Sequence, residues 1–144
     1  MFELELITHL FPKAHFIHIV RDPRANISSQ RSRWKDASTF TCAKWWKDSV
    51  TIGHKLAQSA PNKVTTISYE NLMTYPEQTL RHLLTGLDLP YEVGVLNFQL
   101  RITDFVPGES PKTVTHHKIL PSRAPAWNTR LTDLDVAVIE KVSK

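Results

Sequence analysis

Apolar residues in this chain fall into helical stripes and short continuous runs, which predict alternating helices and strands. Helical spacing predicts a first helix over residues 2–11, with an apolar stripe formed by Phe2, Leu6, Ile7 and Leu10. Residues 15–20 form a short apolar run, typical of a buried parallel strand. A helix over residues 24–33 and a break at 34–38 follow. A long helix is then predicted over residues 38–60, with one face formed by Trp46, Val50, Gly53, Leu56 and Ala60.

A second strand is predicted over residues 63–68, which are rich in Val, Thr and Ile. Two strands joined by a helical connection make a βαβ unit, so we expect them to be parallel. Pro76 opens another helix, whose apolar stripe is formed by Leu80, Leu83, Leu84 and Leu87.

The C-terminal part of the chain predicts a short helix, an irregular segment and a last helix. The short helix covers residues 92–99, and the irregular segment covers 103–130. Thr132 and Asp135 form a capping box that opens the last helix, whose inward face is formed by Leu134, Val138, Ile139 and Val142. Trp127, just before this helix, is expected to anchor it onto the sheet.

Two strands alone leave both edges of a sheet open, which is not a stable arrangement. We therefore predict an α/β fold with a partial parallel sheet and flanking helices, in a single partial domain over residues 1–144. The missing strands are expected upstream of this sequence.

The composition is that of an ordinary soluble protein, with 41% hydrophobic and 22% charged residues. The apolar runs are too short to span a membrane, and no signal-peptide pattern opens the chain. Cys42 is the only cysteine, which excludes an internal disulfide. We predict a cytoplasmic protein without membrane contact. The net charge of +4 suits an anionic ligand and leaves nucleic acid open as a partner.

An anion site is suggested where the first strand ends in Arg21-Asp22-Pro23-Arg24. Ligands of open α/β sheets bind beyond the carboxyl ends of the strands. A guanidinium fits phosphate oxygens, and the start of the following helix adds N–H donors. Ser29 and Arg33 lie one helical turn apart and, with Arg21, form a candidate phosphate site. The alternative is that Arg21 forms a salt bridge with Asp22 or another carboxylate.

The other candidate residues have plainer explanations. Tyr69, after the second strand, either flanks a ligand or is a half-buried core tyrosine, and spacing alone favours the latter. His116 and His117 diverge and lack a third ligand, so we predict no metal site. A nucleic-acid surface at Trp45 and Trp46 is less economical than a core tryptophan beside a solvated basic face formed by Arg31, Arg33, Lys35, Lys44 and Lys47.

Three sequence blocks together resemble sulfotransferases that use 3′-phosphoadenosine 5′-phosphosulfate (PAPS). Residues 11–24 resemble the segment of that family that binds the 3′-phosphate. Residues 68–72, followed by Tyr75-Pro76-Glu77 and a Leu-rich helix, resemble its second block, and residues 127–132 resemble its third. The bacterial and tyrosyl-protein members are more similar to this chain than the members that act on small phenols.

The resemblance implies the C-terminal half of a P-loop-NTPase-like sulfotransferase fold. By the same resemblance, Arg21 and Ser29 hold the 3′-phosphate, Arg33 also contacts the nucleotide, and Tyr69 lies near the adenosine. The candidates in the basic loop that closes over the cofactor are Lys118 and Arg123.

The family's loop that cradles the 5′-phosphosulfate has no match here, because none of the four glycines lies in a Gly-x-x-x-x-Gly-Lys context. The general base of the family also precedes the Arg-Asp-Pro segment, so no catalytic residue is assigned and turnover by this chain alone is not expected. The implied function is a sulfotransferase fragment that serves transfer from PAPS to a hydroxyl or amine of a small molecule, glycan or peptide, with no metal and no nucleic-acid partner. The alternative is a non-catalytic module that binds anions, nucleotides or nucleic acid.

Overall fold

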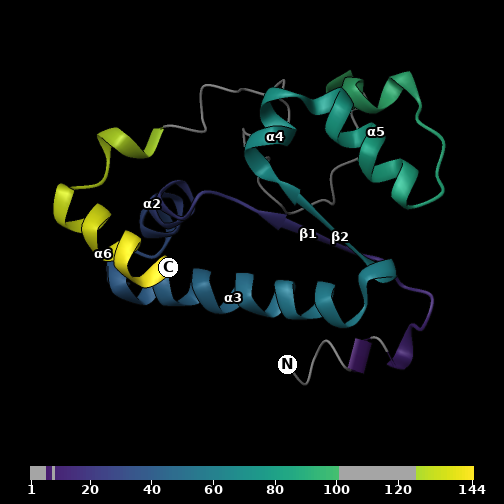
Figure 1. Cartoon of the computed structure of the whole chain (residues 1–144). Helices are drawn as coiled ribbons and strands as arrows, with labels where there is room; N and C mark the ends of the chain where they lie inside the picture. Colours follow the sequence, from purple (N-terminus) through teal and green to yellow (C-terminus); the bar gives the residue numbers. More distant parts are fainter. Residues whose placement is uncertain (1–5, 8, 101–125) are drawn as a thin grey trace, which may run out of the picture.

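The computed structural model describes residues 6, 7, 9–100 and 126–144. Strands β1 (Phe16–Val20) and β2 (Val64–Ser68) pair in parallel, with Phe16 opposite Val64 and Val20 opposite Ser68. The predicted βαβ unit is therefore confirmed, and the sheet of the described residues has two strands. The result is the expected mixed α/β architecture, with helices on both sides of the strand pair (Figure 1).

Helices α2 (Pro23–Arg33) and α3 (Thr39–Ser59) connect the two strands, with a break between them as predicted. The predicted apolar face of α3 is confirmed, because its four members within the helix and Ala60 at the C-cap are all partly buried. Gly53 lets α3 approach the sheet closely, since a Cβ at this position would lie 2.3 Å from the ring of His18.

On the other side of the strand pair lie α4 (Tyr69–Thr74) and α5 (Pro76–Gly86) (Figure 1). The short α4 is missing from the predicted elements. Ser68 is its N-cap, and its hydroxyl accepts a hydrogen bond from the backbone N–H of Asn71 at 3.3 Å. Helix α5 begins at Pro76 as predicted and buries Leu83. The 3-10 turns η1 (Pro61–Lys63) and η2 (Val93–Leu100) precede β2 and follow α5, respectively.

Helix α6 (Asp133–Ser143) starts with the predicted capping box of Thr132 and Asp135. Ile139 is fully buried and joins a core with residues of α2 and α3, namely Ile27, Cys42 and Ala43. The prediction that Leu134 faces inward is wrong, since its side chain is 75% exposed. Asp135 is the residue that faces α3, and the preceding residue is turned about 100° away from it.

Two predicted segments, the first helix and the irregular segment, lie only partly within the described residues. Residues 6, 7, 9 and 10 are helical, in line with the first predicted helix. In the segment predicted to be irregular, Ala126–Thr129 forms the 3-10 turn η4, and residues 101–125 lie outside the described residues.

One face of β1 is exposed. Ile17 and Ile19 alternate with His18, which faces α3, and their side chains are 47% and 53% exposed. Two large apolar side chains on this face of β1 are therefore in contact with solvent.

Candidate functional site

The carboxyl ends of the two strands bring together two of the predicted site residues. Arg21 directly follows β1 and Tyr69 directly follows β2, and the register pairs the residues before them, Val20 and Ser68. The Cζ atom of Arg21 lies 4.4 Å from the centroid of the Tyr69 ring. This is a cation–π distance, so the tyrosine ring fixes one side of the guanidinium.

The salt-bridge alternative for Arg21 does not match the structure. Within the described part of the chain, no carboxylate forms an ion pair with Arg21. Its Nε atom is buried and has no hydrogen-bond partner there. An unmet buried donor is costly, and a cation without a counter-ion favours an anionic ligand.

Asp22 instead is the N-cap of α2. Its Oδ1 accepts hydrogen bonds from the backbone N–H groups of Arg24 and Ala25, at 2.8 and 3.3 Å. Its Oδ2 pairs with the guanidinium of Arg24 at 2.7 Å. Partial burial alone would raise the pKa of Asp22, but the hydrogen bonds from Arg24 and Ala25 outweigh it and lower that pKa.

This capping corrects one sequence-based expectation. The start of α2 was expected to supply N–H donors to an anion, but these donors are already used. Pro23 has no N–H, Arg24 and Ala25 donate to the Asp22 carboxylate, and Asn26 donates to the Asp22 carbonyl. The arginine side chain, rather than the helix terminus, is therefore the anion-binding element here.

Ser29 and Arg33 both lie in α2, and both are exposed. The structure records no contact between either residue and Arg21, so their convergence on one phosphate stays a prediction. Ser28, the neighbour of Ser29, is buried, which assigns the hydroxyl of Ser29 to the solvent side of the helix. Lys118 and Arg123 lie outside the described residues.

Trp127 is an anchor, but its partner differs from the expected one. The Cζ atom of Arg24 lies 4.4 Å from the centroid of its ring, so η4 is fixed to the start of α2 rather than to the sheet. The carbonyl of Trp127 also accepts hydrogen bonds from the N–H groups of Arg130 and Leu131, both at 3.0 Å. These contacts connect the anchor to the segment that enters α6.

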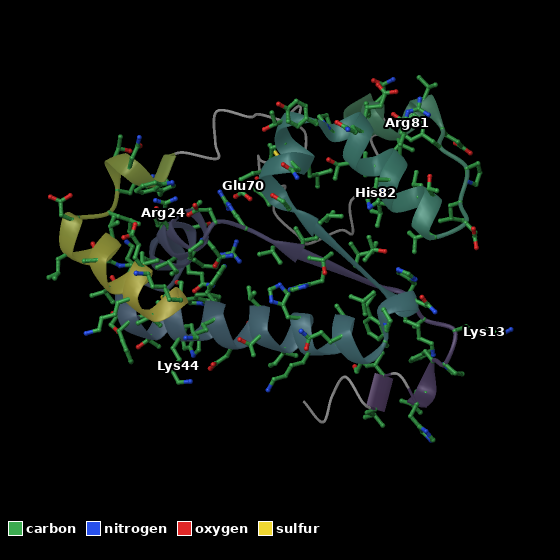
Figure 2. The ribbon with its side chains drawn as sticks, viewed as in Figure 1. Lys13, Arg24, Lys44, Glu70, Arg81 and His82 are labelled. Carbon is green, nitrogen blue, oxygen red and sulfur yellow. The ribbon has the colours of Figure 1, made fainter. Side chains whose placement is uncertain are left out.

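Sequence reasoning missed two residues around Arg21. The indole N–H of Trp46 donates to the carbonyl of Arg21 at 3.0 Å. The carboxylate of Glu70 accepts from the backbone N–H of Asp22 at 3.0 Å, and Glu70 lies where β2 passes into α4 (Figure 2). Both residues line a cleft of about 360 Å³ beside Arg21. The available signal was the position of Glu70 directly after Tyr69 at a strand end.

A histidine pair lies between the sheet and α3. The rings of His18 and His54 meet edge to face, with 5.7 Å between their centroids. Burial, and then the charge of His54, lower the pKa of His18.

The described residues contain no group of three metal-ligating side chains, and none of their helices is long and apolar enough to cross a membrane.

Comparisons with known proteins show which family this chain resembles. The model of the sulfotransferase family matches residues 1–93, which include both strand ends. The chain is 32% identical over 107 residues to protein-tyrosine sulfotransferase 1 of Danio rerio, a match that covers 68% of this chain and 30% of that protein. It is 29% identical over 100 residues to the protein-tyrosine sulfotransferase of Drosophila melanogaster, with 65% and 20% covered.

Two solved structures share the fold. The sulfotransferase domain of the Synechococcus PCC 7002 olefin synthase has a TM-score of 0.70 at 22% identity, covering 91% of this chain and 50% of that one. A sulfotransferase domain from the curacin biosynthetic pathway has a TM-score of 0.65 at 24% identity, with 90% and 53% covered. The chain thus spans less than a third of the two curated relatives and about half of each domain. Because the family model matches well over half of its residues, the chain belongs to the sulfotransferase family.

Proposed function

We propose that this chain supplies the 3′-phosphate and adenosine site of an enzyme that transfers a sulfuryl group from PAPS to an acceptor. One observation carries the proposal. The Arg21 guanidinium lies at the carboxyl end of β1, stacked on Tyr69, with a buried Nε that no described residue satisfies. A phosphate would supply the missing acceptor and counter-charge. Membership of the sulfotransferase family supports the same assignment.

The proposed roles follow from the chemistry of each side chain. Arg21 is a charged, forked donor for the 3′-phosphate, and Ser29 adds a neutral hydroxyl donor. Arg33 contacts the same nucleotide from the next turn of α2. Tyr69 orders Arg21 and lies near the adenosine. Lys118 and Arg123 are the candidates for a basic loop over the cofactor.

A protein or peptide is the acceptor class that the relatives favour, since the Danio rerio and Drosophila melanogaster relatives are both named protein-tyrosine sulfotransferases. A tyrosine hydroxyl is therefore the proposed acceptor for the whole enzyme. PAPS supplies the sulfuryl group. The acceptor proton needs a base within hydrogen-bond reach, and no described residue is assigned that role. This chain is proposed to bind and orient the nucleotide.

The test is binding of adenosine 3′,5′-bisphosphate (PAP), the desulfated product, by calorimetry. The 144-residue chain is expected to bind PAP more tightly than AMP, which lacks the 3′-phosphate. Arg21→Ala removes a charge-assisted contact of roughly 1.5–3 kcal/mol and should weaken PAP binding by about ten- to a hundredfold.

A matched control is Arg81→Ala. Arg81 also lies over a tyrosine ring, but it pairs with Glu77 at 2.8 Å, so its loss should leave PAP affinity unchanged. Equal affinity for PAP and AMP, or unchanged PAP binding in Arg21→Ala, would contradict the proposal. Binding of single-stranded DNA in competition with PAP would favour a nucleic-acid module instead.

A further inference from the structure

Three contacts hold Arg21 and the peptide bond that follows it, two through the backbone and one through the side chain. The indole N–H of Trp46, in α3, donates to the Arg21 carbonyl at 3.0 Å. The next backbone group, the N–H of Asp22, donates to the Glu70 carboxylate at 3.0 Å. The guanidinium itself lies over Tyr69. Thus the peptide group between Arg21 and Asp22 is hydrogen-bonded at both its carbonyl and its N–H.

Glu70 does more than accept one hydrogen bond. Its second oxygen accepts from the hydroxyl of Ser68 at 3.0 Å, so one carboxylate joins the last residue of β2 to the turn after β1. No described cation forms an ion pair with this carboxylate. Hydrogen bonds to an ionised acceptor are stronger than neutral ones, and they are directional. The bridge therefore fixes the distance between the ends of the two strands.

Trp46 holds the opposite side of the same turn. Its ring is partly buried and packs against the core of α2, α3 and α6. The preceding Trp45 is different, because it is largely exposed and meets Trp34 edge to face at 6.1 Å between ring centroids. Two adjacent tryptophans on one helix thus have separate surroundings, and only Trp46 reaches Arg21.

We propose that Trp46 and Glu70 are positioning residues that hold the Arg21 guanidinium in the orientation that receives a 3′-phosphate. They act through Arg21 and do not contact the nucleotide. The inference rests on the proposed function, because it assigns roles around the same site. An arginine fixed before binding loses less side-chain and loop freedom when the ligand arrives, so its contact gives more affinity.

The test uses Trp46→Phe and Glu70→Gln in the 144-residue chain, titrated with PAP and with AMP. Each substitution removes roughly one hydrogen bond at the turn and should weaken PAP binding by about three- to tenfold. AMP binding should change by less than about twofold, because AMP has no 3′-phosphate for Arg21 to hold. If the affinities for PAP and AMP fall by the same factor, the substitution has damaged the structure in general, and the proposal is overturned.

Matched controls and a double-variant comparison sharpen the result. Trp45→Phe and Glu77→Gln change the same residue types outside the turn, and both should bind PAP as the parent chain does. In an Arg21→Ala background, Trp46→Phe and Glu70→Gln should cause no further loss, since the residue through which they act is gone. An additive loss in that background would refute the positioning role.

The outcomes separate the two proposals. If Arg21→Ala leaves PAP binding unchanged, the proposed function itself fails. If Arg21→Ala weakens binding but Trp46→Phe and Glu70→Gln match the parent, only the positioning role fails. Circular dichroism identifies a variant that does not fold, and the other variant then decides the question.

Discussion

The strand-end site and the surface of α5 each carry an arginine stacked on a tyrosine, yet only one of these arginines is neutralised. Arg81 lies 3.9 Å from the centroid of Tyr91 and pairs with Glu77 one turn away. Arg21 lies 4.4 Å from the centroid of Tyr69, and no described carboxylate pairs with it. Arg81 lies on α5, away from the turn between β1 and α2 that carries Arg21 (Figure 2).

A third stacked arginine, Arg24, also has carboxylate partners. Arg24 lies over Trp127 and pairs with both Asp22 and Glu140, at 2.7 and 3.7 Å. Stacking on an aromatic ring is therefore common to structural and candidate binding arginines in this chain. The absence of a carboxylate partner in the described structure is what singles out Arg21, because an uncompensated cation keeps its capacity to bind an anion.

The largest expected effect is a loss of stability at the Arg24–Trp127 pair. Trp127→Ala removes the ring that carries Arg24 and should destabilise the fold by about 2–3 kcal/mol, below the range for a fully buried aromatic. Thermal denaturation should show a melting temperature roughly 6–10 °C lower. An unchanged melting temperature would mean that Trp127 does not anchor η4 to α2.

The carboxylate that neutralises Arg31, that of Asp135, gives a prediction about how stability depends on pH. Hydrogen bonds from Thr39, then from Thr132, and the charge of Arg31 at 2.9 Å together hold the pKa of Asp135 far below its usual range, although burial opposes them. A lowered native pKa gives stability that is present above the unfolded value of about 3.9 and is lost as pH falls below it.

Asp135→Asn should therefore destabilise the fold by about 1 kcal/mol at pH 7, because charged hydrogen bonds become neutral ones. The difference should shrink as the parent chain is acidified from pH 5 towards pH 3, and denaturant titrations at several pH values measure it. A gap that stays constant over this range would show that the Asp135 charge does not stabilise the fold.

Within the candidate site, a neutral donor should matter less than the charged one. Ser29→Ala removes one hydroxyl and should weaken PAP binding by about fivefold, or roughly 1 kcal/mol. Ser32→Ala, in the same helix, is the control. An effect of Ser29→Ala as large as that of Arg21→Ala would change the ranking of the two residues.

The smallest expected effect tests the stacking itself. Tyr69→Leu keeps an apolar side chain beneath Arg21 but removes the ring, and a cation–π contact between half-buried side chains contributes about 0.5–1 kcal/mol when it is not fully desolvated. PAP affinity should fall about two- to fivefold, whereas Tyr91→Leu should leave it unchanged. Identical results for the two variants would erase the distinction between the two stacked pairs.

Local patterns predicted most of the framework. The apolar runs indicated both strands, and the spacing of Trp46, Val50 and Leu56 indicated the buried face of α3. The capping box of α6 depends on two residues three positions apart, so it is visible in the sequence. The inward placement of Leu134 failed because apolar character alone does not define the rotation of a helix whose first turn is oriented by Asp135.

The site was predictable only where its chemistry is local. Arg21 stands out at a strand end, but the choice of Asp22 to cap α2 rather than pair with Arg21 depends on how one carboxylate folds back. Trp46 and Glu70 act across 25 and 48 positions of the chain, and no periodicity reports such pairings. The roles of Ser29, Arg33, Lys118 and Arg123 stay predictions from the family resemblance.

The bridge between Asp22 and Glu70 also bears on how the chain folds. It joins residues 48 positions apart, so it forms only after β1 and β2 have paired. Helices α2 and α3 need no such closure and can form earlier, because contacts distant in sequence carry a larger entropic cost. A partly folded chain with its helices formed would then lack the binding site. A ligand present at a hundred times its Kd would add about 2.7 kcal/mol to the fully paired state alone, coupling the last step of folding to nucleotide concentration.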